Sequence, residues 1–128
     1  MGYNDIQSLQ DRHNNWLSTL DYYAEDLNNL HNRLSQLIIY DTNADAYRDI
    51  EQFENEFEVQ QQKILELIQR VKSSMHGCAI ELQDDAGKIA DELVQDMKCI
   101  KTGLDTVEKK VIRLRKSFHA FLSTVEET

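Results

Sequence analysis

The residues most capable of chemistry lie near the start of the chain, in the stretch "LQDRHNNWLSTLDYYAEDL" at positions 9–27. Histidine and carboxylates ligate metals and transfer protons, but histidine and aromatic side chains also fill the cores of small helical proteins. The spacing separates the two roles. His13 and Trp16 fall in one unbroken series of apolar positions three and four residues apart, which is the buried stripe of a helix. The stretch is therefore predicted to be structural, and His13 is expected to be a half-buried histidine with one hydrogen bond.

A metal centre has little support in the sequence. Di-iron carboxylate bundles place Glu-x-x-His on two helices, and that motif does not occur here. The nearest substitute is His31 with Glu51 and Glu54, which an antiparallel pair of helices would bring close together. A surface ion pair is the favoured interpretation of this group, so the sequence predicts no metal site and no cofactor.

Nucleophilic catalysis is also disfavoured. Ser117 and His119 in "SFHAFLS" are two residues apart, so they point to different faces of a helix and do not pair as nucleophile and base. The chain has no glycine-rich phosphate loop. We therefore predict no catalytic residue and no enzyme activity.

Composition favours one all-helical domain. The chain has 128 residues, which is about one domain, and it contains no proline and only four glycines, so long helices are expected and a sheet is not. The net charge of −9 argues against direct nucleic-acid binding. No apolar run is long enough for a membrane span, and the first residues lack the pattern of a signal peptide. Two cysteines without a CxxC motif fit reduced thiols, so a cytoplasmic location is expected.

Apolar spacing predicts an antiparallel bundle of long helices over residues 1–128. The first helix is expected over residues 5–40 and the second over 43–74, with Gly77 as the strongest helix terminator. The third is expected over 79–125. The predicted structural core includes His13, Trp16, Tyr23, Phe53 and Phe57.

The predicted lengths do not match, and this leaves two alternatives. At about 1.5 Å per residue, a helix over 79–125 would be roughly 70 Å long, whereas the second helix would offer only about 45 Å. Either the last segment breaks near residues 94–103 and gives a four-helix bundle, or its end overhangs and contacts another molecule. The second alternative predicts a homodimer. Its candidate interface residues are Phe118, Phe121, Leu122 and Val125.

Charge is unevenly distributed along the chain. Residues 41–58 are acidic and residues 98–116 are basic, so an antiparallel return is expected to place the two segments side by side. The competing use of the basic segment is a face for an acidic partner. The acidic segment has an alternative use as a decoy or inhibitor that binds a basic protein.

Several stretches resemble a group of small uncharacterised helical proteins from bacteria of the Bacteroidota. The resemblance is carried by "LQDRHNNWLSTLDYYAEDLNNLHNRL", "IEQFENEFEVQQQKI" and "RLRKSFHAFLS". It implies a bacterial cytoplasmic bundle and brings no functional residue with it, since no activity is assigned to that group. This chain departs from the group's pattern, because residues 79–100 lack the proline-containing break found before the last helix.

Two functions remain from the sequence. The favoured one is a non-catalytic interaction or scaffold protein whose apolar stripe associates with a second copy or with a partner helix. The acidic decoy is the alternative, and a metal-binding bundle comes third. Salt dependence separates the first two, because screening weakens an electrostatic complex more than an apolar contact.

Trp16→Ala tests the structural role of the opening stretch. Truncating a well-buried large aromatic side chain costs about 3–5 kcal/mol of stability. We therefore expect a clear drop in melting temperature, measured by circular dichroism. An unchanged melting temperature would show that Trp16 is not part of the core.

Overall fold

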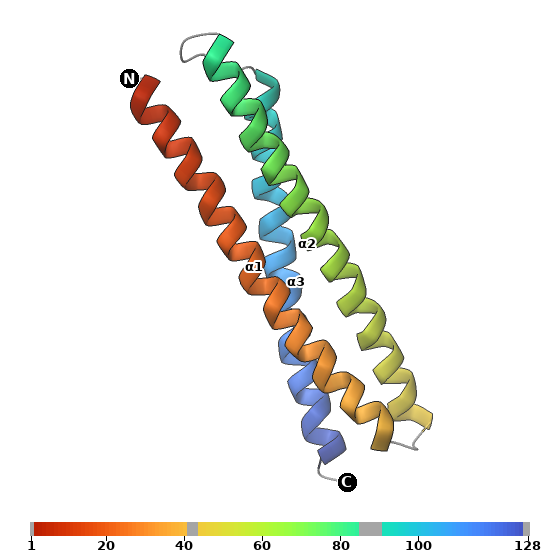
Figure 1. The fold of residues 1–128 in the computed structure, drawn as a ribbon. Helices are drawn as coiled ribbons and strands as arrows, with labels where there is room; N and C mark the ends of the chain where they lie inside the picture. Colours follow the sequence, from red (N-terminus) through yellow and green to blue (C-terminus); the bar gives the residue numbers. More distant parts are fainter. Residues whose placement is uncertain (1, 41–43, 85–90, 127–128) are drawn as a thin grey trace.

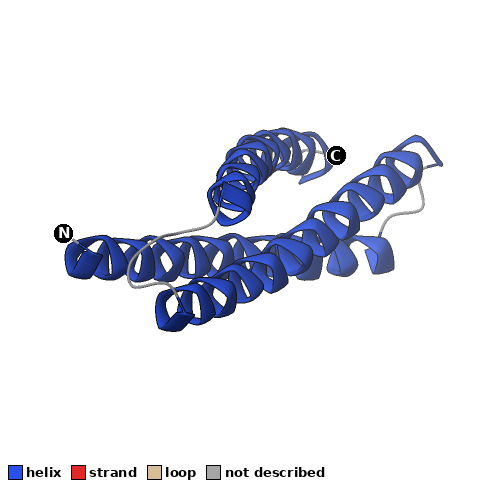
Figure 2. Cartoon of the chain, turned by 90° about the horizontal axis from the view of Figure 1, so that it is seen from above, coloured by secondary structure: helices blue, strands red, loops and turns tan. Residues whose placement is uncertain are grey.

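The computed structural model describes the chain as three helices, over residues 2–40, 44–84 and 91–126, with side chains described over 8–37, 45–77 and 94–125. They are α1 (Gly2–Tyr40), α2 (Ala44–Asp84) and α3 (Asp91–Glu126). α2 runs antiparallel to both neighbours, so α1 and α3 point the same way (Figure 1). Seen along another axis, α3 lies over the pair formed by α1 and α2 (Figure 2). Within the described ranges, no helix is both long and apolar enough to cross a bilayer.

The core confirms the all-helical bundle and follows a seven-residue repeat. Buried residues recur every seven positions on each helix, which is the spacing of a coiled coil. These positions are Leu20, Leu27 and Leu34 on α1, Ile50, Phe57, Ile64 and Val71 on α2, and Met97, Leu104, Val111 and Phe118 on α3. Of the residues expected in the core, only Phe53 is partly rather than fully buried.

Some helix bounds differ from those expected. α1 begins at Gly2 rather than at residue 5. The expected start of the second helix at residue 43 lies outside the described residues. α2 does not end at residue 74, because it continues through Gly77 to Asp84.

The continuation of α2 has a cause in its sequence. Val71, Met75, Cys78 and Leu82 are spaced by four, three and four residues, so the apolar repeat carries on past Gly77. A glycine inside a helix costs only about 1 kcal/mol relative to alanine, which such a repeat can outweigh. The reversal to α3 therefore comes later than expected, and the part of the expected third helix over residues 85–90 lies outside the described residues.

The longer α2 removes the mismatch in helix lengths. α2 has 41 residues and α3 has 36. At about 1.5 Å per residue they are roughly 62 and 54 Å long, so α2 covers the whole of α3. α3 is continuous across residues 94–103, and the described residues give no fourth helix.

The predicted overhanging seam is therefore wrong. Phe118 and Leu122 are buried within the chain, at 0% and 4% exposure, and Phe121 and Val125 are partly buried. Phe118 lies edge-on to Phe53 and Phe57, with ring centroids 5.4 and 5.5 Å away. These rings belong to the core of one chain, because α2 reaches far enough to cover them.

Gly103, in the segment where a break was considered, serves close packing instead. A Cβ atom built at this position would lie 2.9 Å from Leu67 Cδ2 on α2. Such a distance is well inside van der Waals contact, so the missing side chain lets α3 approach α2.

One buried polar pair joins α1 to α2. The His13 ring is 1% exposed, with Nδ1 2.7 Å from the Leu9 carbonyl oxygen and Nε2 2.9 Å from Ser74 Oγ. A carbonyl only accepts, so Nδ1 carries the donated hydrogen, and in a neutral ring Nε2 accepts from the Ser74 hydroxyl. His13 is thus fully buried with two hydrogen bonds, rather than half-buried with the expected single bond.

Ser74→Ala is expected to destabilise the fold, because it leaves His13 Nε2 buried without a partner. That loss costs about 1–3 kcal/mol, whereas replacing both members by apolar residues is nearer to neutral. Urea unfolding of Ser74→Ala, His13→Leu and the double variant measures the coupling between them. Ser35→Ala is the matched control, because Ser35 is exposed and bonds only within its own helix. Equal losses in the Ser74 and Ser35 variants would contradict the buried pair.

Candidate partner-binding groove

An open groove runs between the N-terminal halves of α1 and α3, and we call it the basic groove. Its volume is about 760 Å³, inside the roughly 300–1,000 Å³ range of ligand sites. In Figure 1 the N-terminal end of α1 stands apart from the N-terminal end of α3. The groove is lined by Leu9, Arg12 and Trp16 on α1 and by Val94, Met97, Lys98, Lys101 and Thr102 on α3.

The floor of the groove is apolar and firmly supported. Trp16 and Met97 are each 7% exposed, so most of each side chain is packed in the core. The His13 ring meets Trp16 edge-on, with centroids 5.3 Å apart, and the hydrogen bonds of His13 fix that ring. Val94, at 39% exposed, is the most accessible apolar residue of the groove. A partner would therefore meet a preformed apolar surface.

The rim of the groove is basic. Arg12 stands on the α1 side, and Lys98 and Lys101 stand on the α3 side. No carboxylate is among the described residues that line it, although the chain as a whole has a net charge of −9. Lys101 also donates to Asp105 Oδ1, one turn along α3, at 3.0 Å. The basic groove is thus a local exception to the acidic character of the protein.

Further along the bundle, polar contacts join α1 to α3. Arg115 donates two hydrogen bonds to Asp26 Oδ2, one of them from Nε at 3.0 Å. The hydrogen bond to Asp26 raises the pKa of Arg115. Burial, and then the neighbouring Glu108 carboxylate on α3, raise the pKa of Tyr23.

The basic segment is divided between two neighbours. Lys110 lies with Glu56 in a depression between α2 and α3, which fits the expected pairing of basic and acidic segments. Lys98 and Lys101 instead border the groove shared with α1. The carboxylates of α2 also divide, because Asp49 and Glu56 face α3 while Glu54 faces His31 on α1. Asp41, in the same acidic segment, lies outside the described residues.

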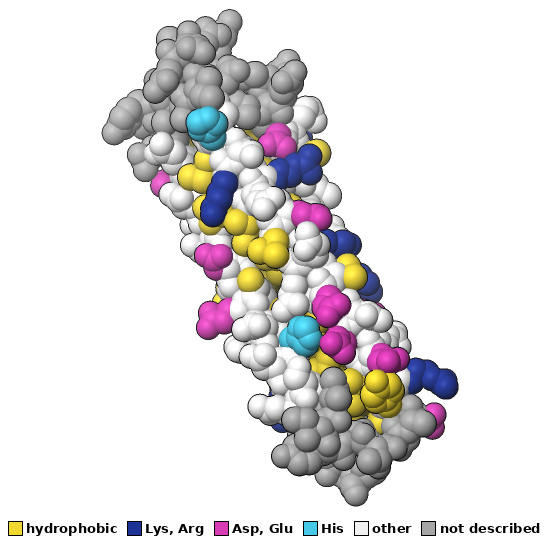
Figure 3. All heavy atoms as spheres, turned by 45° about the vertical axis from the view of Figure 1, so that its right-hand side comes forward, with side chains coloured by type: hydrophobic (Ala, Val, Ile, Leu, Met, Phe, Trp, Pro, Cys, Tyr) yellow, Lys and Arg dark blue, Asp and Glu magenta, His cyan; other side chains and the backbone are white. Residues whose placement is uncertain are grey.

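The possible metal group has a different composition from the one expected. His31 Nε2 is 3.9 Å from Glu54 Oε1, close enough for an ion pair when the imidazole is protonated, and Glu58 completes the cluster in place of Glu51. Figure 3 shows carboxylates gathered beside a histidine on one face of the molecule.

Ser117 and His119 are both exposed on α3.

Sequence reasoning did not place Arg12 and Val94 in the groove. Lys98 and Lys101 were visible as part of a basic segment, but nothing in their spacing places them opposite α1. The sequence did contain one signal for the groove: Arg12 is a cation that flanks the apolar stripe containing Leu9 and Trp16.

No protein-family model matches the chain, and no match was found among curated proteins or solved structures. The resemblance to the Bacteroidota group therefore rests on the sequence pattern alone. The structure shows a small all-helical protein of three antiparallel helices.

Tyr23→Phe should change the response of stability to alkaline pH. Because the pKa of Tyr23 is raised in the folded protein, its contribution to stability is fully present below the usual tyrosine pKa near 10. That contribution is lost as pH rises through the pKa of the folded state. The free energy of unfolding of the wild type should therefore fall more steeply above pH ~10 than that of Tyr23→Phe. Urea titrations at a series of pH values from neutral upward measure this dependence of the free energy of unfolding on pH. Identical profiles for the wild type and Tyr23→Phe would refute the expectation.

Proposed function

We propose that this protein is a non-catalytic interaction module that binds one amphipathic helix of a partner protein in the basic groove. The partner helix would carry acidic residues beside its apolar face. The observation that carries the proposal is the combination of an apolar floor with three cations, and no carboxylate among the described lining residues, in a chain of net charge −9.

The shape of the groove favours a helix. α1 and α3 run parallel and provide walls about two turns long, Leu9 to Trp16 and Val94 to Thr102. A helix laid between them would pack its apolar face on Trp16 and Met97, in the manner of other helix-in-groove complexes. It would also turn the three-helix arrangement into a locally four-helical one, a common form of bundle.

Charge supports an acidic partner. Arg12 stands on one wall and Lys98 on the other, so carboxylates on both flanks of a docked helix would meet cations. Exposed pairs contribute only about 0.2–1 kcal/mol each, so apolar contact supplies most of the affinity and charge selects the partner. Like charges on a basic helix would oppose docking.

The acidic decoy has less support. At 100° per residue, Asp49 and Glu56 lie on one side of α2 and Glu54 and Glu58 lie on the other. Part of the negative charge also faces groups of this chain, since Glu54 pairs with His31. The carboxylates therefore do not form one dense surface for a basic protein.

Synthetic helical peptides test the proposal. Two labelled peptides of about 20 residues, roughly 30 Å long, would share a leucine face and differ only in glutamate or lysine on the flanks. Fluorescence anisotropy with the whole protein should give binding of the glutamate peptide at least about tenfold tighter, a difference near 1.4 kcal/mol. Added salt should narrow that difference without abolishing binding.

Matched variants locate the binding surface. Val94→Glu places a charge on the groove floor and should weaken binding, whereas Ile112→Glu, at a residue 38% exposed elsewhere on α3, should not. Arg12→Glu with Lys98→Glu should reverse the preference between the two peptides. Equal binding of both peptides by the wild type, or unchanged binding by Val94→Glu, would contradict the proposal.

Self-association is the other expected use of an apolar surface on this chain, and one measurement separates it from partner binding. Sedimentation equilibrium of the wild type and Val94→Glu gives the oligomeric state of each. A dimer that Val94→Glu dissociates would make the second copy the occupant of the basic groove. A monomeric wild type leaves the groove open for another protein.

A further inference from the structure

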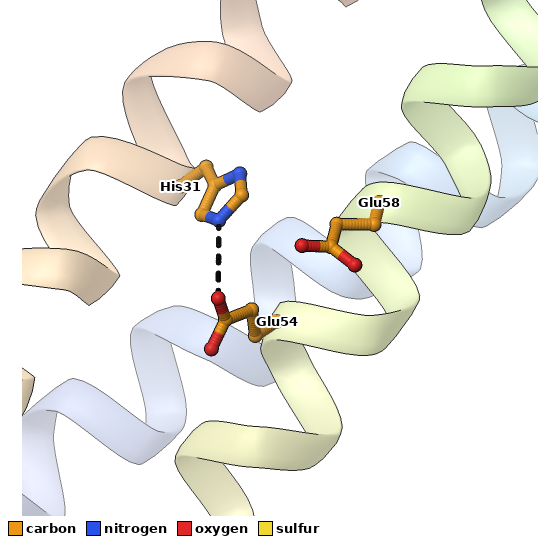
Figure 4. A group of neighbouring side chains, drawn as sticks. All are labelled: His31, Glu54 and Glu58. Carbon is orange, nitrogen blue, oxygen red and sulfur yellow. Dashed lines mark ion pairs between the residues drawn. The ribbon is translucent and has the colours of Figure 1, made fainter.

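A second group of side chains faces solvent at the other end of the α1–α2 pair, and we call it the His31 cluster. It consists of His31 on α1 and Glu54 and Glu58 on α2, whose side chains converge in Figure 4. One donor atom from each residue lies within 4.8 Å of the other two. The cluster shares no residue with the basic groove.

The positions of these side chains are fixed by their helices. The His31 ring packs against Phe57, with centroids 6.2 Å apart, and Phe57 is fully buried. Glu54 and Glu58 stand on either side of Phe57 in sequence and one turn apart, so both project from the same side of α2 toward the ring. The imidazole is thus held in place, while the two carboxylates are on exposed, adjustable side chains.

The charges of the cluster are incompletely balanced. Glu54 lies 3.9 Å from His31 and forms an ion pair with it only when the imidazole is protonated, whereas Glu58 makes no ion pair or hydrogen bond among the described residues. Two carboxylates at positions i and i+4 repel each other. A divalent cation between them would remove that repulsion and would be neutralised by the two carboxylates.

We propose that the His31 cluster binds one divalent transition-metal ion, of which Zn²⁺ is the type, and that the ion links α1 to α2. One imidazole nitrogen with two carboxylate oxygens suits Zn²⁺, Co²⁺ or Mn²⁺ better than Mg²⁺ or Ca²⁺, which prefer oxygen ligands alone. At metal–ligand distances of about 2.0–2.2 Å, the donors around a tetrahedral ion are roughly 3.4 Å apart. Rotation of the two glutamate side chains brings the three donors from their present separations to that spacing, and water completes the coordination.

Metal titration of the whole protein tests this proposal. Isothermal titration of the chelator-treated protein with Zn²⁺ is expected to show one equivalent bound, and the melting temperature should rise with Zn²⁺ concentration by mass action. Co²⁺ should give visible d–d absorption that Zn²⁺ displaces. No heat and no thermal shift up to millimolar Zn²⁺ would overturn the proposal.

Two variants and one matched control assign the binding to these residues. Glu58→Gln and His31→Gln should each weaken Zn²⁺ binding by at least about tenfold, because each removes a ligand that must be deprotonated to bind. Glu51→Gln makes the same change at an exposed position of α2 outside the cluster, and it should leave the affinity unchanged. Glu58 is exposed, so its variant keeps the fold, which circular dichroism without metal verifies. Wild-type affinity in Glu58→Gln, or an equal loss in Glu51→Gln, would refute the site.

Discussion

The packing of α2 against both of its neighbours is the interaction on which the rest of the structure depends. Ile50, Phe57, Ile64 and Val71 are all 0–1% exposed and lie seven residues apart, so one stripe of α2 forms the centre of the bundle. Because α2 is antiparallel to both neighbours, its length decides how much of α1 and α3 is covered. Burial of such side chains contributes about 1.5–3 kcal/mol each, far more than any exposed ion pair described above.

The open groove is a consequence of this arrangement. α1 and α3 are placed mainly by α2, and beyond the groove they are tied together through Asp26 and Arg115. Toward their N-terminal ends they separate (Figure 1). The basic groove lies between them. Three helices around a shared centre thus leave one side open, and the charged residues described as lining the groove there are positive. The His31 cluster belongs to the other helix pair, so the two proposed sites are structurally independent.

Local features of the sequence predicted most of the fold, and features set by distant packing escaped prediction. The apolar repeats identified three long helices and the burial of residues such as Trp16 and Phe57, because helical periodicity is a local property. The end of α2 was misplaced because Gly77 was given more weight than the repeat that continues beyond it. The groove depends on how far α1 and α3 diverge, which neither helix encodes alone. Glu58, rather than the expected Glu51, lies beside His31, because this contact depends on the axial register of α1 against α2.

The hydrogen bond between His13 and Ser74 has a consequence for helix register. Seven-residue repeats are degenerate, since α1 could slide along α2 by two turns and still place leucine against apolar partners. His13 occupies the same position of the repeat as Leu20, Leu27 and Leu34, so such a slide would part its ring from the Ser74 hydroxyl and leave both buried groups unpaired. At about 1–3 kcal/mol per unsatisfied group, the shifted packings are excluded. One polar pair in an apolar interface thereby selects a single register of α1 along α2. That register also sets the positions of Leu9 and Arg12 opposite α3.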